Sequence, residues 1–191
     1  MAFDTHINNI CRQCYFHLHN IGSIRPSLTS AAAEKIIHAF VSSKIDNCNS
    51  LLHALPKKSL HKLQRVQNMA ARIVLRAPKR ESVTGMLKEL HWLPVEQRIH
   101  YKIATLTWKC INNRAPLYLK ELTEIYTPTR ALRSSNELLL VKHVPKTNYA
   151  ARSFKCAAPN IWNSLPSSLR SVQSYETFKK HLKTYLFTCA F

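Results

Sequence analysis

Glycine is nearly absent from this chain: Gly22 and Gly85 are the only two in 191 residues. Loops that cradle phosphates need several glycines, because a residue without a Cβ lets the backbone come close to the ligand. A P-loop and a dinucleotide-binding fingerprint are therefore excluded. Tight β-hairpins also rely on glycine, so its scarcity favours helices.

Acidic residues are few as well. Ten Asp and Glu stand against 28 Lys and Arg, which gives a net charge of +18 and a pI near 10.0. Solubility does not require such an excess, whereas a positive field of this size concentrates partners that carry phosphate. Nucleic acid is the first candidate partner and an anionic membrane surface is the second. Two-metal nuclease or polymerase chemistry needs converging carboxylates, and the acids here are scattered.

Long apolar runs are missing. None approaches the roughly 18–20 residues that span a bilayer. The first residues, MAFDTHINNI, lack a basic segment followed by an apolar one, so we expect no signal peptide. Six cysteines in 191 residues are a low density, and without a secretory signal they indicate reduced thiols in an intracellular protein.

What the sequence does contain is helical periodicity. Apolar residues recur at spacings of three and four, which predicts helices over 4–21, 30–55 with a weak break at 46–47, 58–76, 95–113 and 175–187. The run ELLLVKHVP is instead β-like. We predict a mainly α protein, in which a helical bundle precedes a mixed α+β C-terminal module with a short β element near 138–157. The expected domains are 1–77 and 82–191, separated at APKR (77–80), with 81–125 helical and 126–191 mixed.

The helix predicted over 58–76 has the clearest pattern. Its apolar residues share one side, and five cations occupy the opposite side within an arc of about 80°: Lys58, Lys62, Arg65, Arg72 and Arg76. Like charges four residues apart on a helix each cost about 0.2–0.5 kcal/mol. A solvated face whose side-chain stems cover apolar surface is one explanation. We favour phosphate contact, because no acid within 56–80 offsets the charge.

A second basic face follows the stretch LHWLPVEQRIHYK (90–102). Pro94 is tolerated in the first turn of the next helix, and that helix carries Arg98, Lys102 and Lys109 opposite its apolar side. Tyr101 and Trp108 lie beside these cations and could stack on bases while the cations hold phosphates. Alternatively, both rings pack against a neighbouring helix, since aromatic residues dominate cores.

The spacing Cys11-x2-Cys14-x2-His17-x-His19 suggests zinc, but it is irregular for a zinc finger or knuckle. Cys11 and Cys14 share a helical face with apolar residues, so we expect them to pack as small hydrophobes. Ten histidines make chance pairings with Ser or Cys common, and spacing alone therefore identifies no hydrolase. We assign no catalytic residue, metal ligand or cofactor.

Several segments share a likeness with one family. They are FDTHINNICRQCYFHLHNIGSIRPSL, HAFVSSKIDNCNSLLHALP, LQRVQNMAARIVL, LKELHWLPVEQRIHYKIATLTWKCINNRAPLYL, AARSFKCAAPNIWNSLP and TFKKHLKTYLF. In this order the chain resembles, over about residues 3–188, the C-terminal part of reverse transcriptases from non-LTR (LINE-type, jockey-like) retrotransposons. LHWLPVEQRI together with IWNSLP is the most specific part of the resemblance.

The resemblance implies a thumb-like region over 1–77, followed by a C-terminal extension. The helix over 58–76 would then grip the template–primer duplex. The family's catalytic Asp-Asp turn lies in a palm domain, and the only aspartates here are Asp4 and Asp46. We therefore expect no enzyme activity from this chain on its own. Cys14 and His17 depart from the residues expected at their positions.

The resemblance also implies partners and a location. The expected partners are RNA, DNA or an RNA–DNA hybrid, together with palm and fingers domains, and no small-molecule substrate. The expected location is the nucleus, with a cytoplasmic ribonucleoprotein stage. Two alternatives stay open: a non-functional or partner-dependent remnant of a retrotransposon reading frame, and a membrane-surface protein. The second is less favoured, because the apolar helix faces lack Trp and Phe enrichment and can bury one another.

Overall fold

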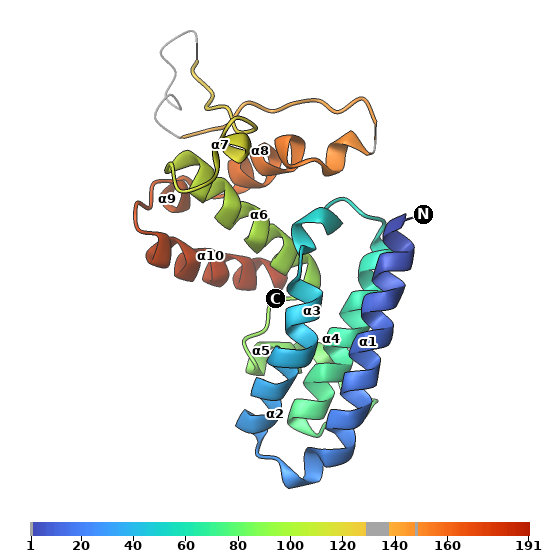
Figure 1. The fold of residues 1–191 in the computed structure, drawn as a ribbon. Helices are drawn as coiled ribbons and strands as arrows, with labels where there is room; N and C mark the ends of the chain where they lie inside the picture. Colours follow the sequence, from blue (N-terminus) through green and yellow to red (C-terminus); the bar gives the residue numbers. More distant parts are fainter. Residues whose placement is uncertain (1, 129–137, 148) are drawn as a thin grey trace. The chain divides into compact units, whose positions relative to one another are not determined.

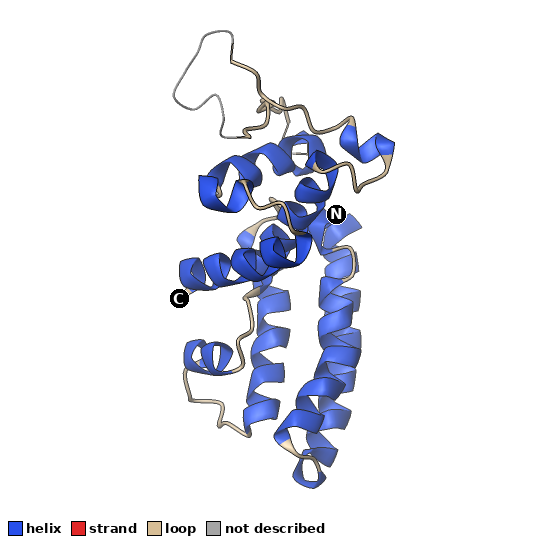
Figure 2. Ribbon diagram, turned by 90° about the vertical axis from the view of Figure 1, so that its left-hand side faces the viewer, coloured by secondary structure: helices blue, strands red, loops and turns tan. Residues whose placement is uncertain are grey.

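The computed structural model describes residues 2–128, 138–147 and 149–191. They group into two compact units, 1–98 with 189–191 and 99–188. The described residues are mainly helical and include no strand, which confirms the prediction of a mainly α protein (Figure 2). The boundary expected at 77–80 lies inside the first unit, and the two units divide between Arg98 and Ile99.

Three long helical segments build the first unit. They are α1 (Ala2–Ile24), a run composed of α2 (Ser30–Ile37), a π-helical turn (His38–Ser42) and α3 (Ser43–Asp46), and α4 (Lys57–Leu75). Figure 1 shows α1 and α4 side by side and running in the same direction, with α2 running opposite to both. Short 3-10 turns at Arg25–Ser27 and Asn49–Leu52 connect them. The helices predicted over 4–21 and 58–76 are therefore confirmed, and α5 (Val83–Glu89) follows them.

Polar pairs fix how α1 and α4 lie along each other. Near their starts, Ser59 Oγ donates a hydrogen bond to Asp4 Oδ1 at 2.8 Å. One turn further, Lys62 Nζ donates to Asn8 Oδ1, also at 2.8 Å. Between the helices lies an apolar core whose buried members include Ile7, Cys14, Leu18, Leu63, Val66 and Ala70. The two helices thus share one register over most of their length.

A buried arginine closes the far end of this pair. The Arg25 guanidinium donates to Ile73 O at 2.8 Å, to Val74 O at 2.6 Å and to Leu28 O at 2.6 Å. The last carbonyls of a helix have no partner within the helix, and the negative end of its dipole favours a cation. Arg25 therefore caps α4 and fixes the loop that leads into α2.

The stretch Trp92-Leu93-Pro94 forms the corner between α5 and α6 (Val95–Ile111). Pro94 directly precedes α6, whereas the prediction placed it in the first turn of that helix. Proline disfavours helical geometry in the residue before it, so the Leu93 carbonyl needs partners from outside a helix. Gln67 Nε2 donates to it at 2.8 Å and Arg98 Nε at 2.9 Å.

The other groups of the corner are held in the same way. Trp92 is buried and donates Nε1–H to Glu34 Oε1 on α2 at 3.0 Å. The backbone N–H of Val95 donates to Gln64 Oε1 on α4 at 2.9 Å. The corner is therefore tied to both α2 and α4 by side chains.

The second unit surrounds an aromatic core. It contains most of α6, α7 (Leu117–Lys120), a 3-10 turn (Ala150–Arg152), α8 (Phe154–Ser164), α9 (Ser167–Arg170) and most of α10 (Tyr175–Ala190). The last two residues of α10 belong to the first unit. Trp108, Trp162 and Phe178 are fully buried, and Phe178 lies 5.9 Å from both indole rings between centroids. Both indoles donate to backbone carbonyls, Trp108 to Val172 O and Trp162 to Leu138 O.

The β element predicted near 138–157 is not found among the described residues of that segment. One isolated bridge pairs Ile125 with Leu140, and α8 already begins at Phe154. The reason lies in Asn163: its side chain accepts from Leu140 N–H at 2.9 Å and donates to Leu140 O at 2.8 Å. A helix side chain thus satisfies the backbone groups that a second strand would have paired. Residues 129–137 and 148 lie outside the described residues.

The corner gives a prediction about stability. Changing Gln67 to Ala leaves one donor on the Leu93 carbonyl and removes a buried amide, so we expect the free energy of unfolding to fall by about 1–3 kcal/mol. Urea denaturation followed by circular dichroism measures this. Lys35→Ala on the exposed side of α2 is the control, with an expected change within about 0.5 kcal/mol. Equal midpoints for the two variants would contradict the role given to Gln67.

Candidate nucleic-acid interface

Four of the five cations predicted on the helix over 58–76 lie on one side of α4, and the fifth, Arg76, directly follows the helix as its C-terminal cap. The five are here called the cationic stripe: Lys58, Lys62, Arg65, Arg72 and Arg76. The spacing of four, three and seven residues keeps the four members within α4 on one helical face. The five differ in exposure. Lys58, Arg65 and Arg76 are exposed, whereas Lys62 and Arg72 are half-buried.

Three members of the stripe have structural partners. Lys62 donates to the Asn8 amide oxygen, and Arg72 Nη2 donates to the Glu81 backbone carbonyl at 3.3 Å. Arg76, in left-handed geometry at the end of α4, donates to Arg25 O and Pro26 O at 3.0 Å. All these acceptors are neutral, so the hydrogen bonds orient the cations without cancelling their charge.

Lys58 and Arg65 are the members most available to a ligand. Both are exposed, and α4 carries no acidic residue. Arg65 lies close enough to Tyr15 on α1 to act on its phenol: burial raises the pKa of Tyr15, and the positive charge of Arg65 opposes that rise. Tyr15 is 39% exposed. An aromatic ring therefore lies beside the cationic stripe.

Tyr15 was missed by the reasoning from sequence alone. Its signal is the row Asn8, Arg12, Tyr15 and His19, which recurs at four, three and four residues along α1. Asn8 contacts Lys62, so this row is the side of α1 that borders the cationic stripe. An alignment of the two helices, which the sequence does not reveal, is needed to see it.

Arg98 has a different role from the one predicted. Its side chain forms a salt bridge with Asp46 at 2.7 Å and is only 17% exposed. It also donates to the Leu93 carbonyl. We therefore correct the prediction of phosphate contact: this arginine belongs to the corner and its charge is already paired.

The remaining predicted residues lie in the second unit, where they do not form one open surface. Lys102 is exposed and Tyr101 is half-buried. Lys109 places Nζ over the Tyr175 ring, 4.9 Å from its centroid. Trp108 is 1% exposed and packs on Phe178. The stacking role considered for Trp108 is therefore wrong, because its ring faces are covered by the core of its own unit.

A row of Ser42, His38 and Glu34 resembles a nucleophile–base–acid arrangement. His38 Nδ1 lies 3.1 Å from Ser42 Oγ, and His38 Nε2 lies 3.5 Å from Glu34 Oε1. However, Ser42 is buried, and Glu34 Oε1 already accepts from Trp92. The His38 ring also packs against Trp92 at 5.1 Å between centroids. We interpret the row as a set of contacts that holds Trp92 in place.

The cysteines behave as the helical pattern predicts. Cys11 and Cys14 are buried in the core of the first unit, and burial raises the pKa of both thiols, that of Cys14 to about 11. Within the part of the chain that the structure describes, no three His, Cys, Asp or Glu side chains are grouped as metal ligands. No described helix is both long and apolar enough to span a membrane.

Comparisons with known proteins give no further guidance. A scan against protein-family models finds no match, and searches of curated proteins and of solved structures find none either. The resemblance to LINE-type reverse transcriptases therefore stays a prediction, and the geometry of α1 and α4 has to carry the functional argument.

The buried thiols give a prediction about pH. At a pH above the ordinary thiol pKa of 9.0, the unfolded chain loses the Cys14 proton while the folded chain retains it until about pH 11. Stability should therefore be fully present below pH 9 and should decrease as the pH rises from 9 to 11. Thermal melts across this range measure the effect.

Cys14→Ala provides the control for this pH dependence. The variant is less stable at neutral pH because a cavity replaces the sulfur, but its melting temperature should fall less steeply between pH 9 and 11. Identical slopes for the variant and the natural sequence would contradict the prediction.

Proposed function

We propose that this chain binds nucleic acid through the cationic stripe of α4 and the adjoining side of α1. In this proposal it acts as the thumb-like part of a LINE-type reverse transcriptase. The observation that carries the proposal is the state of the stripe: Lys58 and Arg65 are exposed, and Lys62, Arg72 and Arg76 are oriented by neutral acceptors.

The energetics of the stripe support a polyanionic partner. Four cations on one helical face, with Arg76 at the helix end, repel one another, and an acid on the same helix would relieve that repulsion, but α4 has none. A phosphate backbone supplies negative charges at regular spacing and releases its counterions on binding. An oriented cation also loses less conformational freedom on binding than a free one, which favours the contact.

The side of α1 adds a second type of contact. The exposed Tyr15 ring borders Arg65 and could lie against a sugar or a base, since aromatic rings accept bases of any sequence. Nothing in this arrangement reads sequence, so the proposed binding follows backbone shape and charge. An RNA–DNA hybrid, duplex DNA and RNA are all candidate ligands.

The proposal includes what the chain does not do by itself. With Asp4 and Asp46 as its only aspartates, it would bind the nucleic acid and would not catalyse polymerisation. Catalysis would come from palm and fingers domains, and the site of action would be the nucleus.

A partner-dependent remnant is the second candidate, and exposed apolar residues favour it. Phe16 is 64% exposed, Leu117 68% and Val144 92%. Side chains of this kind can indicate a surface that another protein covers. A remnant that folds only with its partner would show no cooperative melt as an isolated monomer, whereas the proposed binding module would show one.

The test is fluorescence anisotropy with an RNA–DNA hybrid hairpin over a series of salt concentrations. The double variant Lys58→Ala/Arg65→Ala removes the two exposed members of the cationic stripe that do not donate a hydrogen bond to a described residue. We expect weaker binding and a plot of log K against log salt whose slope is smaller by about one for each phosphate that these cations neutralise in the natural sequence.

The matched control is Lys35→Ala/Lys180→Ala, which removes the same charge from α2 and α10 at exposed positions. It should lower affinity only slightly, through the reduced overall field. Equal slopes for the two double variants would assign the binding to net charge alone and reject the cationic stripe.

A further inference from the structure

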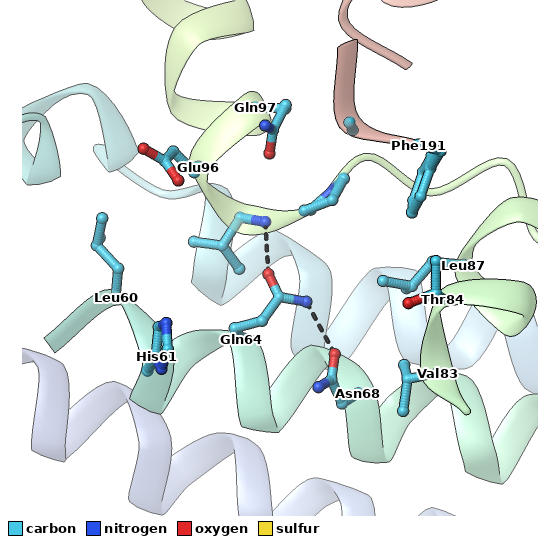
Figure 3. A pocket seen from close by; sticks show the side chains of 13 residues that line it. Leu60, His61, Gln64, Asn68, Val83, Thr84, Leu87, Glu96, Gln97 and Phe191 are labelled. Atoms are coloured by element: carbon cyan, nitrogen blue, oxygen red, sulfur yellow. Dashed lines mark hydrogen bonds between the residues drawn. The ribbon is translucent and has the colours of Figure 1, made fainter. Parts of the chain in front are cut away.

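Beside the cationic stripe, α4 presents a second polar row composed of His61, Gln64 and Asn68. At 100° per residue this row lies about a quarter turn from the stripe. Together with α5 and the first turn of α6 it lines a recess of about 320 Å³, here called the amide recess (Figure 3). All of its lining residues belong to the first unit.

The amides in this recess are held in fixed orientations. Gln64 Oε1 accepts from the Val95 backbone N–H, and Gln64 Nε2 donates to Asn68 Oδ1 at 2.8 Å and to Gln67 Oε1 at 3.0 Å. The Asn68 oxygen is thereby occupied, while its NH₂ group makes no hydrogen bond to a described residue. Figure 3 shows Gln97 on the opposite side of the recess from Asn68. A ligand thus meets the Asn68 NH₂ group, whose orientation is set by the bond to Gln64 before the ligand binds.

The charge of the recess differs from that of the stripe. Among the described residues that line it there is no Lys or Arg, and Glu96 contributes a carboxylate. A phosphate would be repelled there. A neutral group that carries an N–H donor would be attracted, because it can donate to Glu96 and accept from the amides.

The walls of the recess suit a flat heterocycle. Leu60, Val83 and Leu87 provide apolar surface, and the Phe191 ring lies beside Leu87 (Figure 3). A volume of about 320 Å³ is at the lower end of the range of roughly 300–1,000 Å³ for small-molecule sites. That size fits one ring system and leaves no room for a long ligand.

We propose that the amide recess binds a single unstacked nucleobase that bears an exocyclic amino group, such as cytosine or adenine. The amino group donates to the Glu96 carboxylate, and the ring acceptors of the base receive hydrogen bonds from Asn68 and Gln97. Carboxylates accept from the cytosine amino group and amides pair with adenine in known readout. This inference rests on the proposed function: the cationic stripe holds the phosphates of the strand whose base enters the recess.

The test compares short single strands that differ only in their bases. Oligodeoxycytidylate and oligodeoxyuridylate stack weakly, and they differ at the position where cytosine has an amino group and uracil a carbonyl. An abasic deoxyribose-phosphate strand of the same length carries the phosphates alone. We expect the natural sequence to bind the cytosine strand at least about fivefold more tightly than the uracil strand, with the abasic strand weakest.

Two variants connect this preference to the recess. Thr84 is exposed at its edge and its side chain makes no hydrogen bond to a described residue, so Thr84→Trp fills the recess without breaking a side-chain hydrogen bond. Glu96→Gln keeps the shape and replaces an acceptor by a group that can donate to the uracil carbonyl. Both should abolish the preference for cytosine. Thr84→Trp should leave binding of the abasic strand and its salt dependence unchanged, whereas Glu96→Gln removes one negative charge and should strengthen binding of all three strands slightly and by the same factor.

The outcomes separate this inference from the function on which it rests. Lys58→Ala/Arg65→Ala should weaken all three strands equally and keep the preference for cytosine. Equal affinity of the natural sequence for the cytosine and uracil strands would reject base binding in the recess. A preference for cytosine that survives Thr84→Trp would reject it too. Neither result would bear on phosphate binding by the cationic stripe. Failure to bind any of the three single strands would overturn the recess, and failure to bind the hybrid hairpin as well would overturn the proposed function.

Discussion

The Leu93 carbonyl is the point on which the first unit depends. The proline that follows keeps this residue out of a helix, so its oxygen must find partners elsewhere. Gln67 from α4 and Arg98 from α6 supply them, and the Arg98 charge is in turn held by Asp46 at the end of α3. Gln64 accepts from the Val95 backbone N–H after the carbonyl, and Glu34 accepts from the Trp92 indole before it. One backbone corner therefore connects four helices, α2, α3, α4 and α6, and α4 carries the cationic stripe.

This arrangement explains why the most distinctive stretches of the sequence are distinctive. In LHWLPVEQRI, Trp92 and Arg98 form hydrogen bonds or salt bridges that stabilise the fold. In IWNSLP, Trp162 and Asn163 do the same. Their side chains replace backbone partners at positions where the chain leaves regular structure. Such residues constrain a fold strongly, and they carry no chemistry of their own. A resemblance based on them bears on architecture more directly than on activity.

Much of the helical structure could be predicted from sequence, because periodicity reports a buried face directly. The helix over 58–76, the buried pair Cys11 and Cys14 and the helix start near Pro94 were all predicted this way. Contacts between segments could not be predicted. A carbonyl acceptor for Arg25, or an amide partner for Leu140, has no signature in composition or spacing. Trp108 was ambiguous for the same reason, since a periodic pattern does not say which face of an aromatic helix a neighbour covers.

The π-helical turn at His38–Ser42 changes the direction in which the following side chains of its helical run point. The buried apolar residues of this run repeat every four residues: Ala33, Ile37, Val41 and Ile45. In a regular α-helix such a repeat drifts by about 40° per step and would wind away from the core. A turn that holds one residue more absorbs this drift and returns the repeat to the same side. The same correction leaves the Phe40 ring on the outside, 5.3 Å from His17 between centroids. The exposed Phe40 ring therefore accompanies a four-residue repeat of buried side chains, which a regular α-helix with 3.6 residues per turn cannot keep on one side.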